Sequence, residues 1–301
     1  MAMHEPWAVP ARPVRKRARQ TGEGLRAYDR AWLWFSRVLI WLSIVFALFP
    51  IVSVVFASLG PGESFFHPSI WPERWTLENY ANLFDKGLGS EYLIWVKNTF
   101  IVAMSVAVVT TLITVLAAFG YSRMRFPGRR FALMVVFLLQ MFPAAMSIPA
   151  LFGVLAKVGG LDTLWGLILV MCGTGAFGIW LVKNYIDNIP RELDEAAMVD
   201  GATSRQIFLR IILPLAKPMI IVQFLWGFMS VINEYAISAV ILKSGANYTL
   251  PLGLKTFSND FATKWGVFAA ATLLSSVPVV ILWMINQRWV QQGLTQGAIK
   301  G

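Results

Sequence analysis

The sequence predicts an all-α, polytopic membrane protein with six transmembrane helices, cytoplasmic N- and C-termini, and a cytoplasmic coupling helix between spans four and five. Three observations lead to this fold class. Of the 301 residues, 57% are hydrophobic and 14% charged, whereas a soluble domain is about half apolar and a quarter charged. Six apolar stretches are long enough to cross a bilayer, which takes about 20 helical residues. Lysine and arginine gather in alternate segments between these stretches.

The first predicted span follows a basic segment, as a secretory signal would. Its apolar core is longer than that of a signal, and no clear small-residue cleavage site follows it. We therefore expect an uncleaved span. Residues 1–30 form a basic cytoplasmic tail with the composition of a disordered extension, and residues 31–301 form the transmembrane domain. The spans are Val38–Leu59, Thr99–Tyr121, Phe131–Ala156, Leu164–Val182, Met219–Leu242 and Val267–Ile285.

The orientation follows from where the basic residues lie. The segment between spans two and three holds Arg123, Arg125, Arg129 and Arg130 and no acid, whereas residues 60–92 hold five acids and two basic residues. Because basic loops stay on the cytoplasmic side, both termini are predicted there, and residues 60–92 outside. The net charge of +10 then indicates contact with membrane lipid and not with nucleic acid.

Several kinds of chemistry are missing from the sequence. It has no Gly-Lys dipeptide, and therefore no nucleotide-binding loop of the Gly-x-x-x-x-Gly-Lys type. Cys172 is the sole cysteine, and His4 and His67 are the sole histidines, which excludes an internal disulfide and a cysteine-based metal site. We predict no catalytic residues, no metal ligands and no cofactor bound by this chain.

The segment between spans four and five, residues 188–214, is the most informative part of the chain. Glu192, Asp194 and Glu195 place negative charge at the start of a helix, where the helix dipole favours it. Gly201 suits the left-handed position that ends such a helix. Thr203 and Gln206 have the spacing of a capping box that starts a second helix. On these grounds alone, an amphipathic connector lying on the headgroups and a docking element remain equally open.

A resemblance distinguishes these two interpretations. The run Glu195-Ala196-Ala197, followed by Gly201 and by Ile211-x-Leu213-Pro214, resembles the EAA loop of ABC importer permeases. Asp200-Gly201-Ala202, Leu213-Pro214-Leu215 and the C-terminal tail 287–301 are similar to the maltose-type carbohydrate-uptake branch, in particular to the smaller permease subunits of maltose/maltodextrin importers. The resemblance covers about residues 30–301.

The resemblance implies a set of partners. Such a chain is a non-catalytic, multi-pass permease of a prokaryotic inner membrane, and it pairs with a second permease subunit. A separate ATPase dimer binds ATP and Mg, and an extracytoplasmic solute-binding protein delivers the carbohydrate, here a maltodextrin or a related oligosaccharide. The ATPase-coupling residues would be Glu195, Ala196, Ala197, Asp200, Gly201, Ile211, Leu213 and Pro214.

Four polar residues in the predicted spans are candidates for the translocation path: Gln140, Ser147, Asn233 and Glu234. Glu234 is the only acid inside a predicted span. An intramembrane carboxylate faces a water-filled cavity or pairs with another helix, and both interpretations stay open. Pro143 and Pro149 in span three free backbone carbonyls where that helix can bend.

Other functions remain as alternatives. One is an ABC permease for another neutral solute. Another is an ion-coupled secondary transporter, which calls for several intramembrane charges or an inverted repeat. An intramembrane enzyme needs paired catalytic groups at membrane depth, and the predicted spans hold a single acid.

Overall fold

The computed structural model describes residues 27–61, 71–72, 74–85, 89–141, 144–173, 176–257 and 264–295, with backbone alone at 27–30, 89–90, 144–145, 176 and 290–295. These residues form helices and no strand, which confirms the all-α prediction for this part of the chain. The predicted basic tail lies outside it up to residue 26. The larger helices are α1 (Ala27–Leu59), α3 (Gly89–Arg123), α4 (Arg129–Gln140), α5 (Ala144–Val158), α6 (Leu164–Cys172), α7 (Ala176–Asp187), α8 (Glu192–Val199), α11 (Lys217–Ile232) and α14 (Trp265–Thr295).

Short helices complete the fold: α2 (Glu78–Leu83), α9 (Ser204–Ile207), the π-helical turn η1 (Phe208–Ile212), α10 (Leu213–Leu215), α12 (Ala236–Ile241), the 3-10 turn η2 (Gly245–Asn247) and α13 (Leu250–Lys255). Among the described residues, α1, α3 and α14 are long and apolar enough to cross a membrane, and two bent helix pairs raise the number of spans to at most 5. Predicted span three is divided between α4 and α5, and span five between α11 and α12. The count of six spans therefore stays a prediction.

The contacts divide the chain into two units, residues 1–51 and 52–301. In the first unit, the described part of α1 exposes large apolar side chains along its whole length, among them Trp34, Trp41 and Phe46. An α-helix that is apolar on every side is stable only when lipid or other membrane helices surround it. This part of α1 therefore has the surface of a membrane helix.

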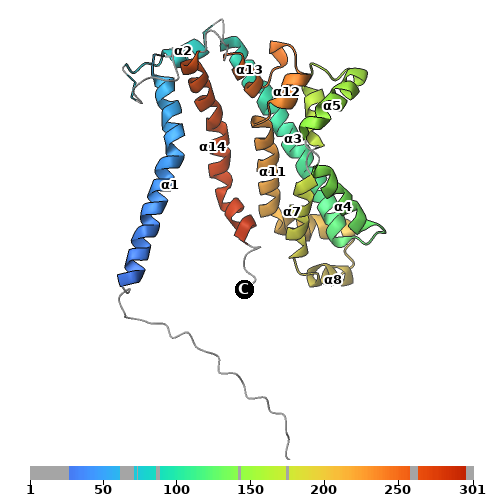
Figure 1. Cartoon of the computed structure of the whole chain (residues 1–301). Coiled ribbons are helices and arrows are strands. Elements are labelled where there is room, and N and C mark those ends of the chain that lie inside the picture. Colours follow the sequence, from blue (N-terminus) through green and yellow to red (C-terminus); the bar gives the residue numbers. More distant parts are fainter. Residues whose placement is uncertain are drawn as a thin grey trace, which may run out of the picture. The chain divides into compact units, whose positions relative to one another are not determined.

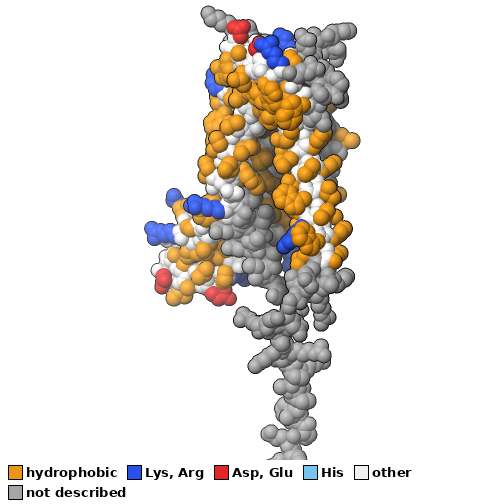
Figure 2. Space-filling view, turned by 90° about the vertical axis from the view of Figure 1, so that its left-hand side faces the viewer, with side chains coloured by type: hydrophobic (Ala, Val, Ile, Leu, Met, Phe, Trp, Pro, Cys, Tyr) orange, Lys and Arg blue, Asp and Glu red, His pale blue; other side chains and the backbone are white. Residues whose placement is uncertain are grey.

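The second unit is built around α3. This helix packs against α6, α7 and α11, and α11 also packs against α14, so that α11 lies between α3 and α14 (Figure 1). A Cβ added at Gly227 of α11 would lie 3.1 Å from the Ala107 Cα atom of α3. Small residues thus let the two helix backbones approach closely, as is common in membrane bundles. Hydrophobic side chains cover the length of the helices, and charged ones lie near the ends (Figure 2).

Polar side chains at the start of α3 hold the segment that connects α12 to α13. Trp95 Nε1 donates to the Gly245 carbonyl (2.9 Å), and Asn98 Nδ2 donates to the carbonyls of Ala246 and Tyr248 (2.9 and 3.0 Å). The Gly245 carbonyl also accepts from the Tyr248 N–H (3.3 Å). The side chains of Trp95 and Asn98 thus add hydrogen bonds to carbonyls of a segment that has no long helix to pair them. This segment forms an ordered cap over one end of α3.

Asp162 ties the segment between α5 and α6 to the same cap. Its Oδ1 accepts hydrogen bonds from the backbone N–H groups of Ser244 (3.0 Å) and Lys243 (2.8 Å). These two bonds lower the pKa of Asp162 from 3.8 to about 2, because they stabilise the ionised carboxylate. Asp162 also has a positive φ of 54°, a conformation that Asp and Asn tolerate better than most residues.

The lowered pKa predicts a pH dependence of stability. The stabilisation by Asp162 is complete above the unfolded-state pKa of 3.8 and disappears as the pH falls toward about 2. Asp162→Asn keeps an acceptor oxygen but does not titrate. The thermal midpoint of the wild type should therefore exceed that of Asp162→Asn at pH 5, and this difference should shrink as the pH falls to 2. Lys243→Gln should retain the wild-type profile, because the donor is backbone. A difference between wild type and Asp162→Asn that is constant with pH would contradict the assignment.

Candidate functional site

The connector between α7 and α11 begins with α8, whose two ends are well defined. Glu192, Asp194 and Glu195 lie in its first turn, as predicted. Gly201 has a φ of +80° and follows the last helical turn. Its N–H donates to the Met198 carbonyl (3.0 Å) and the N–H of Ala202 donates to the Ala197 carbonyl (2.9 Å). This pair of bonds is a Schellman motif, and it confirms Gly201 as the left-handed residue that ends the helix.

The second half of the connector leads into the membrane bundle. Thr203 and Gln206 form the predicted capping box at the start of α9. The chain then passes through the π-helical turn η1 and through α10, and it bends by 77° between Ser204–Leu215 and α11. Pro218 lies in the first turn of α11, where its missing N–H costs no helical hydrogen bond. Phe208 contacts Phe119 of α3, with ring centroids 4.9 Å apart.

A buried ion pair anchors α8 to the end of α3. Arg123 Nε and Asp194 Oδ2 lie 2.7 Å apart, and each side chain is 8% exposed. Arg123 Nη2 also donates to the Ile189 carbonyl (2.8 Å). The Nε contact lacks hydrogen-bond geometry, and Asp194 Oδ1 has no hydrogen-bond partner among the described residues. The pair therefore acts mainly through charge, in surroundings where either charge alone would be costly.

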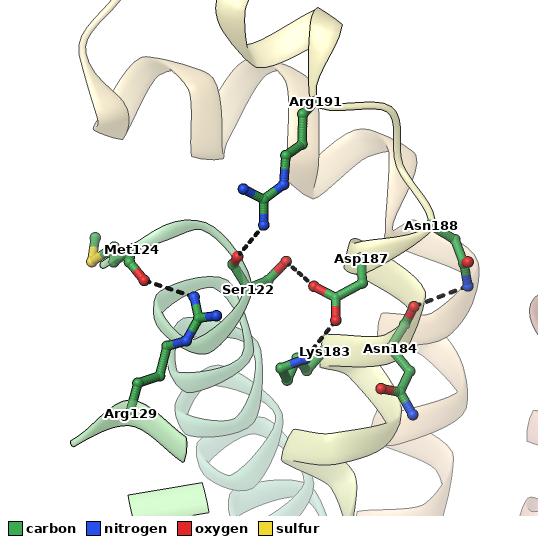
Figure 3. A network of polar contacts seen from close by, with 8 residues as sticks. All are labelled: Ser122, Met124, Arg129, Lys183, Asn184, Asp187, Asn188 and Arg191. Carbon is green, nitrogen blue, oxygen red and sulfur yellow. Dashed lines mark hydrogen bonds and ion pairs between the residues drawn. The ribbon is translucent and has the colours of Figure 1, made fainter. Parts of the chain in front are cut away.

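A second set of polar contacts joins the end of α3 to α7 and to Arg191, the residue before α8 (Figure 3). Ser122 Oγ donates to Asp187 Oδ1 (2.6 Å), and Lys183 pairs with the other carboxylate oxygen. Arg191 Nη2 donates to the Ser122 carbonyl (3.3 Å). Sequence reasoning missed the two contacts to Ser122, because these join residues more than 60 positions apart in the chain. The Lys183–Asp187 pair is local, with the i, i+4 spacing of a single helix. The only signal was the position of Ser122 and Arg123 at the end of a predicted span.

The outer side of α8 faces solvent. Glu195, Ala196, Asp200 and Gly201 are exposed. So are Met198 and Val199, at 57% and 87%. Met198 and Val199 adjoin on the exposed side of a rigidly anchored helix, and an exposed apolar patch is a candidate contact surface for a partner protein. Of the other predicted coupling residues, Ala197, Ile211 and Leu213 are half-buried and Pro214 is exposed.

The end of α14 lies beside the connector. Trp289 stacks under the Lys217 ammonium, which lies 4.9 Å from the ring centroid. A hollow of about 610 Å³ opens here, and its lining includes Leu193, Pro214 and Trp289. The predicted tail, residues 287–301, thus starts at the connector. Residues 296–301 lie outside the described part of the chain.

The four predicted path residues do not gather around one cavity. Gln140 lines a cavity of about 360 Å³ together with Thr110 and Thr114 of α3. Asn233 lines another, of about 550 Å³, between α11, α13 and α14. Ser147 is half-buried in α5, and Glu234 is half-buried between α11 and α12. Pro149 lies inside α5, and Pro143 lies outside the described residues.

Glu234 caps α12. Its Oε1 accepts from the Ile237 N–H (2.6 Å), and its Oε2 accepts from the N–H (3.0 Å) and the hydroxyl (2.6 Å) of Ser238. These bonds satisfy N–H groups at a helix start that have no partner within the helix. The carboxylate is therefore occupied by a neighbouring helix, which favours the structural interpretation over the path interpretation.

The cap predicts the effects of substitution at Glu234. Glu234→Ala should lower stability by about 1–2 kcal/mol, the usual cost of losing a helix cap. Glu234→Gln, which keeps one acceptor oxygen, should cost less, and Ser238→Ala should lie between them. Thermal unfolding of the purified chain measures the order. Loss of solute uptake in Glu234→Gln with unchanged stability would favour the path interpretation instead.

Comparison with known proteins adds to this geometry. Residues 110–296 match the family model described as "Binding-protein-dependent transport system inner membrane component". The maltodextrin transport system permease protein MdxG of Bacillus subtilis is 37% identical over 262 residues, which cover 86% of this chain and 93% of MdxG. The galactooligosaccharides transport system permease protein GanQ of the same organism is 36% identical, covering 92% and 98%. A crystal structure of a bacterial ABC transporter involved in the import of the acidic polysaccharide alginate contains a chain that matches with a TM-score of 0.75 at 24% identity, covering 89% of this chain and 99% of that one.

Proposed function

Because the chain belongs to the family of binding-protein-dependent transport system inner membrane components, we propose that it is the permease subunit of an ABC importer for a neutral oligosaccharide. The family membership confirms the resemblance carried by Glu195-Ala196-Ala197 and Gly201. A maltodextrin is the solute best supported, because the maltodextrin permease MdxG is a relative at 37% identity. A galactooligosaccharide is the second candidate, because GanQ is nearly as similar.

The observation that carries this proposal is the structure of α8. Its Schellman end and its ion pair with α3 make it a rigid projection from the bundle. Its exposed apolar and acidic side chains would dock on a separate ATPase dimer, which holds ATP and Mg. This chain contributes no nucleotide-binding loop and no catalytic group to the reaction. The role of this chain is to transmit movement. A displacement of α8 would pass to α3 through Arg123, and to α11 through η1 and α10.

The proposed topology has six spans and both termini in the cytoplasm of a prokaryote, in its inner membrane. Arg123, which holds α8, lies at the end of α3, and the chain continues from it into Arg125, Arg129 and Arg130. These basic residues therefore lie at the same end of α3 as the proposed ATPase surface on α8. This agrees with the positive-inside rule. The cap formed by η2 and α13 would then face the extracytoplasmic solute-binding protein.

A second permease subunit is part of the proposal. The cavities that contain Gln140 and Asn233 are separate and lined mostly by apolar residues, whereas an oligosaccharide needs a continuous passage with hydrogen-bonding groups. Two permease chains facing each other can provide one. When ATP closes the ATPase dimer, the coupling helices of both chains approach each other. The passage then opens outward to receive sugar from the binding protein.

The test is uptake of labelled maltotriose by proteoliposomes that contain this chain, its partner permease, its ATPase and its binding protein. Uptake that requires ATP is the expected result. If galactooligosaccharide is taken up and maltotriose is not, the importer stands and the solute is the second candidate. If the chain associates with no ATPase and uptake follows an ion gradient, the importer proposal is wrong and a secondary transporter replaces it.

A further inference from the structure

The segment that connects α3 to α4 carries a concentration of positive charge that the proposed coupling function does not use. We call Arg125–Phe131 the arginine elbow. It contains Arg125, Arg129 and Arg130, and no Asp or Glu occurs between residues 124 and 161. Among the described residues, no carboxylate lies within ion-pair distance of these three guanidinium groups. Arg123, by contrast, is already paired with Asp194.

The start of α4 increases this positive potential. Gly128 precedes the helix with a φ of 78° and provides no side-chain cap, and the first turn contains no acid. The N-terminus of a helix carries partial positive charge and unpaired N–H groups, which acidic side chains normally compensate. Here Arg129 and Arg130 occupy the first turn instead. Two cations at this position add to the positive potential of the helix start, which an anion from outside the chain would neutralise.

The elbow also has room for such an anion. Arg125–Phe131 line an open hollow of about 760 Å³. Arg129 Nη1 donates to the Met124 carbonyl (3.0 Å), which fixes the curve of the segment (Figure 3). Arg125 and Arg130 make no such bond among the described residues and are exposed. Two guanidinium groups are thus available beside the start of α4.

An exposed apolar stripe runs from the hollow along one face of α4. Phe131, Met134 and Leu138 are exposed at 66%, 51% and 57%. Their spacing of three and four residues places them on one face of the helix. A cationic hollow at the end of an exposed apolar stripe matches a molecule with an anionic head and a long apolar chain. A soluble anion would use the hollow and leave the stripe uncovered.

We propose that the arginine elbow binds an anionic phospholipid. Arg125, Arg130 and the start of α4 hold the headgroup phosphate, and an acyl chain lies along Phe131, Met134 and Leu138. The proposal rests on the chain being a membrane permease and not on the identity of its solute. Because the elbow directly follows Ser122 and Arg123, a bound lipid would brace the part of α3 that anchors α8.

The test titrates the purified full-length chain in detergent with phosphatidylglycerol or phosphatidylcholine and counts bound lipids by native mass spectrometry. The variant is Arg125→Gln/Arg130→Gln, which leaves the Arg129 bond in place. The control is Lys157→Gln/Lys243→Gln, which removes two exposed charges elsewhere. Each basic residue near an anionic membrane contributes about a fivefold change in affinity. The variant should therefore bind phosphatidylglycerol roughly thirtyfold more weakly, and the control should match the wild type.

Three results would overturn the proposal. The first is equal loss of phosphatidylglycerol in variant and control. The second is displacement of the lipid by millimolar inorganic phosphate, which would make the hollow a site for a free anion. The third is unchanged lipid binding together with loss of the ATPase or of the partner permease on purification, which would make the elbow a protein contact. Maltotriose uptake, measured separately, tests the importer proposal and not this one.

Discussion

Gly201→Asp is expected to abolish solute uptake while the chain still folds and inserts. The φ of +80° at Gly201 costs most residues with a Cβ about 1–2 kcal/mol, and Asp less than most. The added Cβ itself would meet no atom within 4 Å, so the cost is conformational and not steric. The new carboxylate would also lie at the negative end of α8, beside Asp200, where the helix dipole disfavours it. Both effects change the end of α8 that is proposed to dock on the ATPase.

Two other substitutions isolate the cause. Gly201→Asn should retain most uptake, because Asn and Asp both tolerate the left-handed conformation better than most residues, and Asn adds no charge. Gly159 has a φ of +70° and equally open space, but it lies between α5 and α6, so Gly159→Asp should leave coupling intact. Uptake and ATPase activity stimulated by the loaded binding protein are measured together. Normal coupling in Gly201→Asp would remove the docking assignment of α8.

Asp194→Ala is expected to have the largest effect on stability. It leaves the Arg123 guanidinium buried without its carboxylate, and breaking a buried ion pair in this way costs about 3–5 kcal/mol. Since Asp194 holds α8 on α3, uptake should be lost with it. Lys183→Met is the matched control: its pair with Asp187 is within one helix and partly exposed, so it should cost at most about 0.5 kcal/mol.

A double substitution distinguishes the charge from the position. Arg123→Met/Asp194→Leu replaces the pair with apolar side chains of similar size, and such replacements are often tolerated. It should recover part of the lost stability, though not all, because the Ile189 carbonyl loses its donor. Thermal unfolding of both single variants and the double variant gives the coupling energy. If the double variant loses as much stability as Arg123→Met and Asp194→Leu lose together, the two residues act independently.

Local patterns in the sequence predicted local structure well. Gly201, the capping box of Thr203 and Gln206, and the acids at the start of α8 all depend on neighbours within a few residues, and the structure has each of them. The all-helical class followed from apolar runs in the same way.

Contacts between distant segments could not be predicted. Nothing near Asp194 in the sequence indicates Arg123, because their proximity depends on how α3 packs against α7 and α8. Glu234 was placed inside a continuous span for a different reason, although α11 ends at Ile232 and the carboxylate caps a separate helix a few residues along the chain. Hydrophobicity alone does not reveal a break within an apolar stretch, since both sides of the break remain apolar.

The 77° bend at Ala216 determines how a push on the connector reaches the bundle. Ala216 is fully buried, its N–H donates to the Ile212 carbonyl, and its carbonyl accepts from the Ile220 N–H, so hydrogen bonds link it to the helical segments on both sides of the bend. Since α9, η1 and α10 meet α11 almost at a right angle, movement along their axis has only a small component along α11. The connector would therefore tilt α11 about its first turn rather than slide it through the bilayer, and tilting one helix of a bundle widens a passage at one end while it narrows the other.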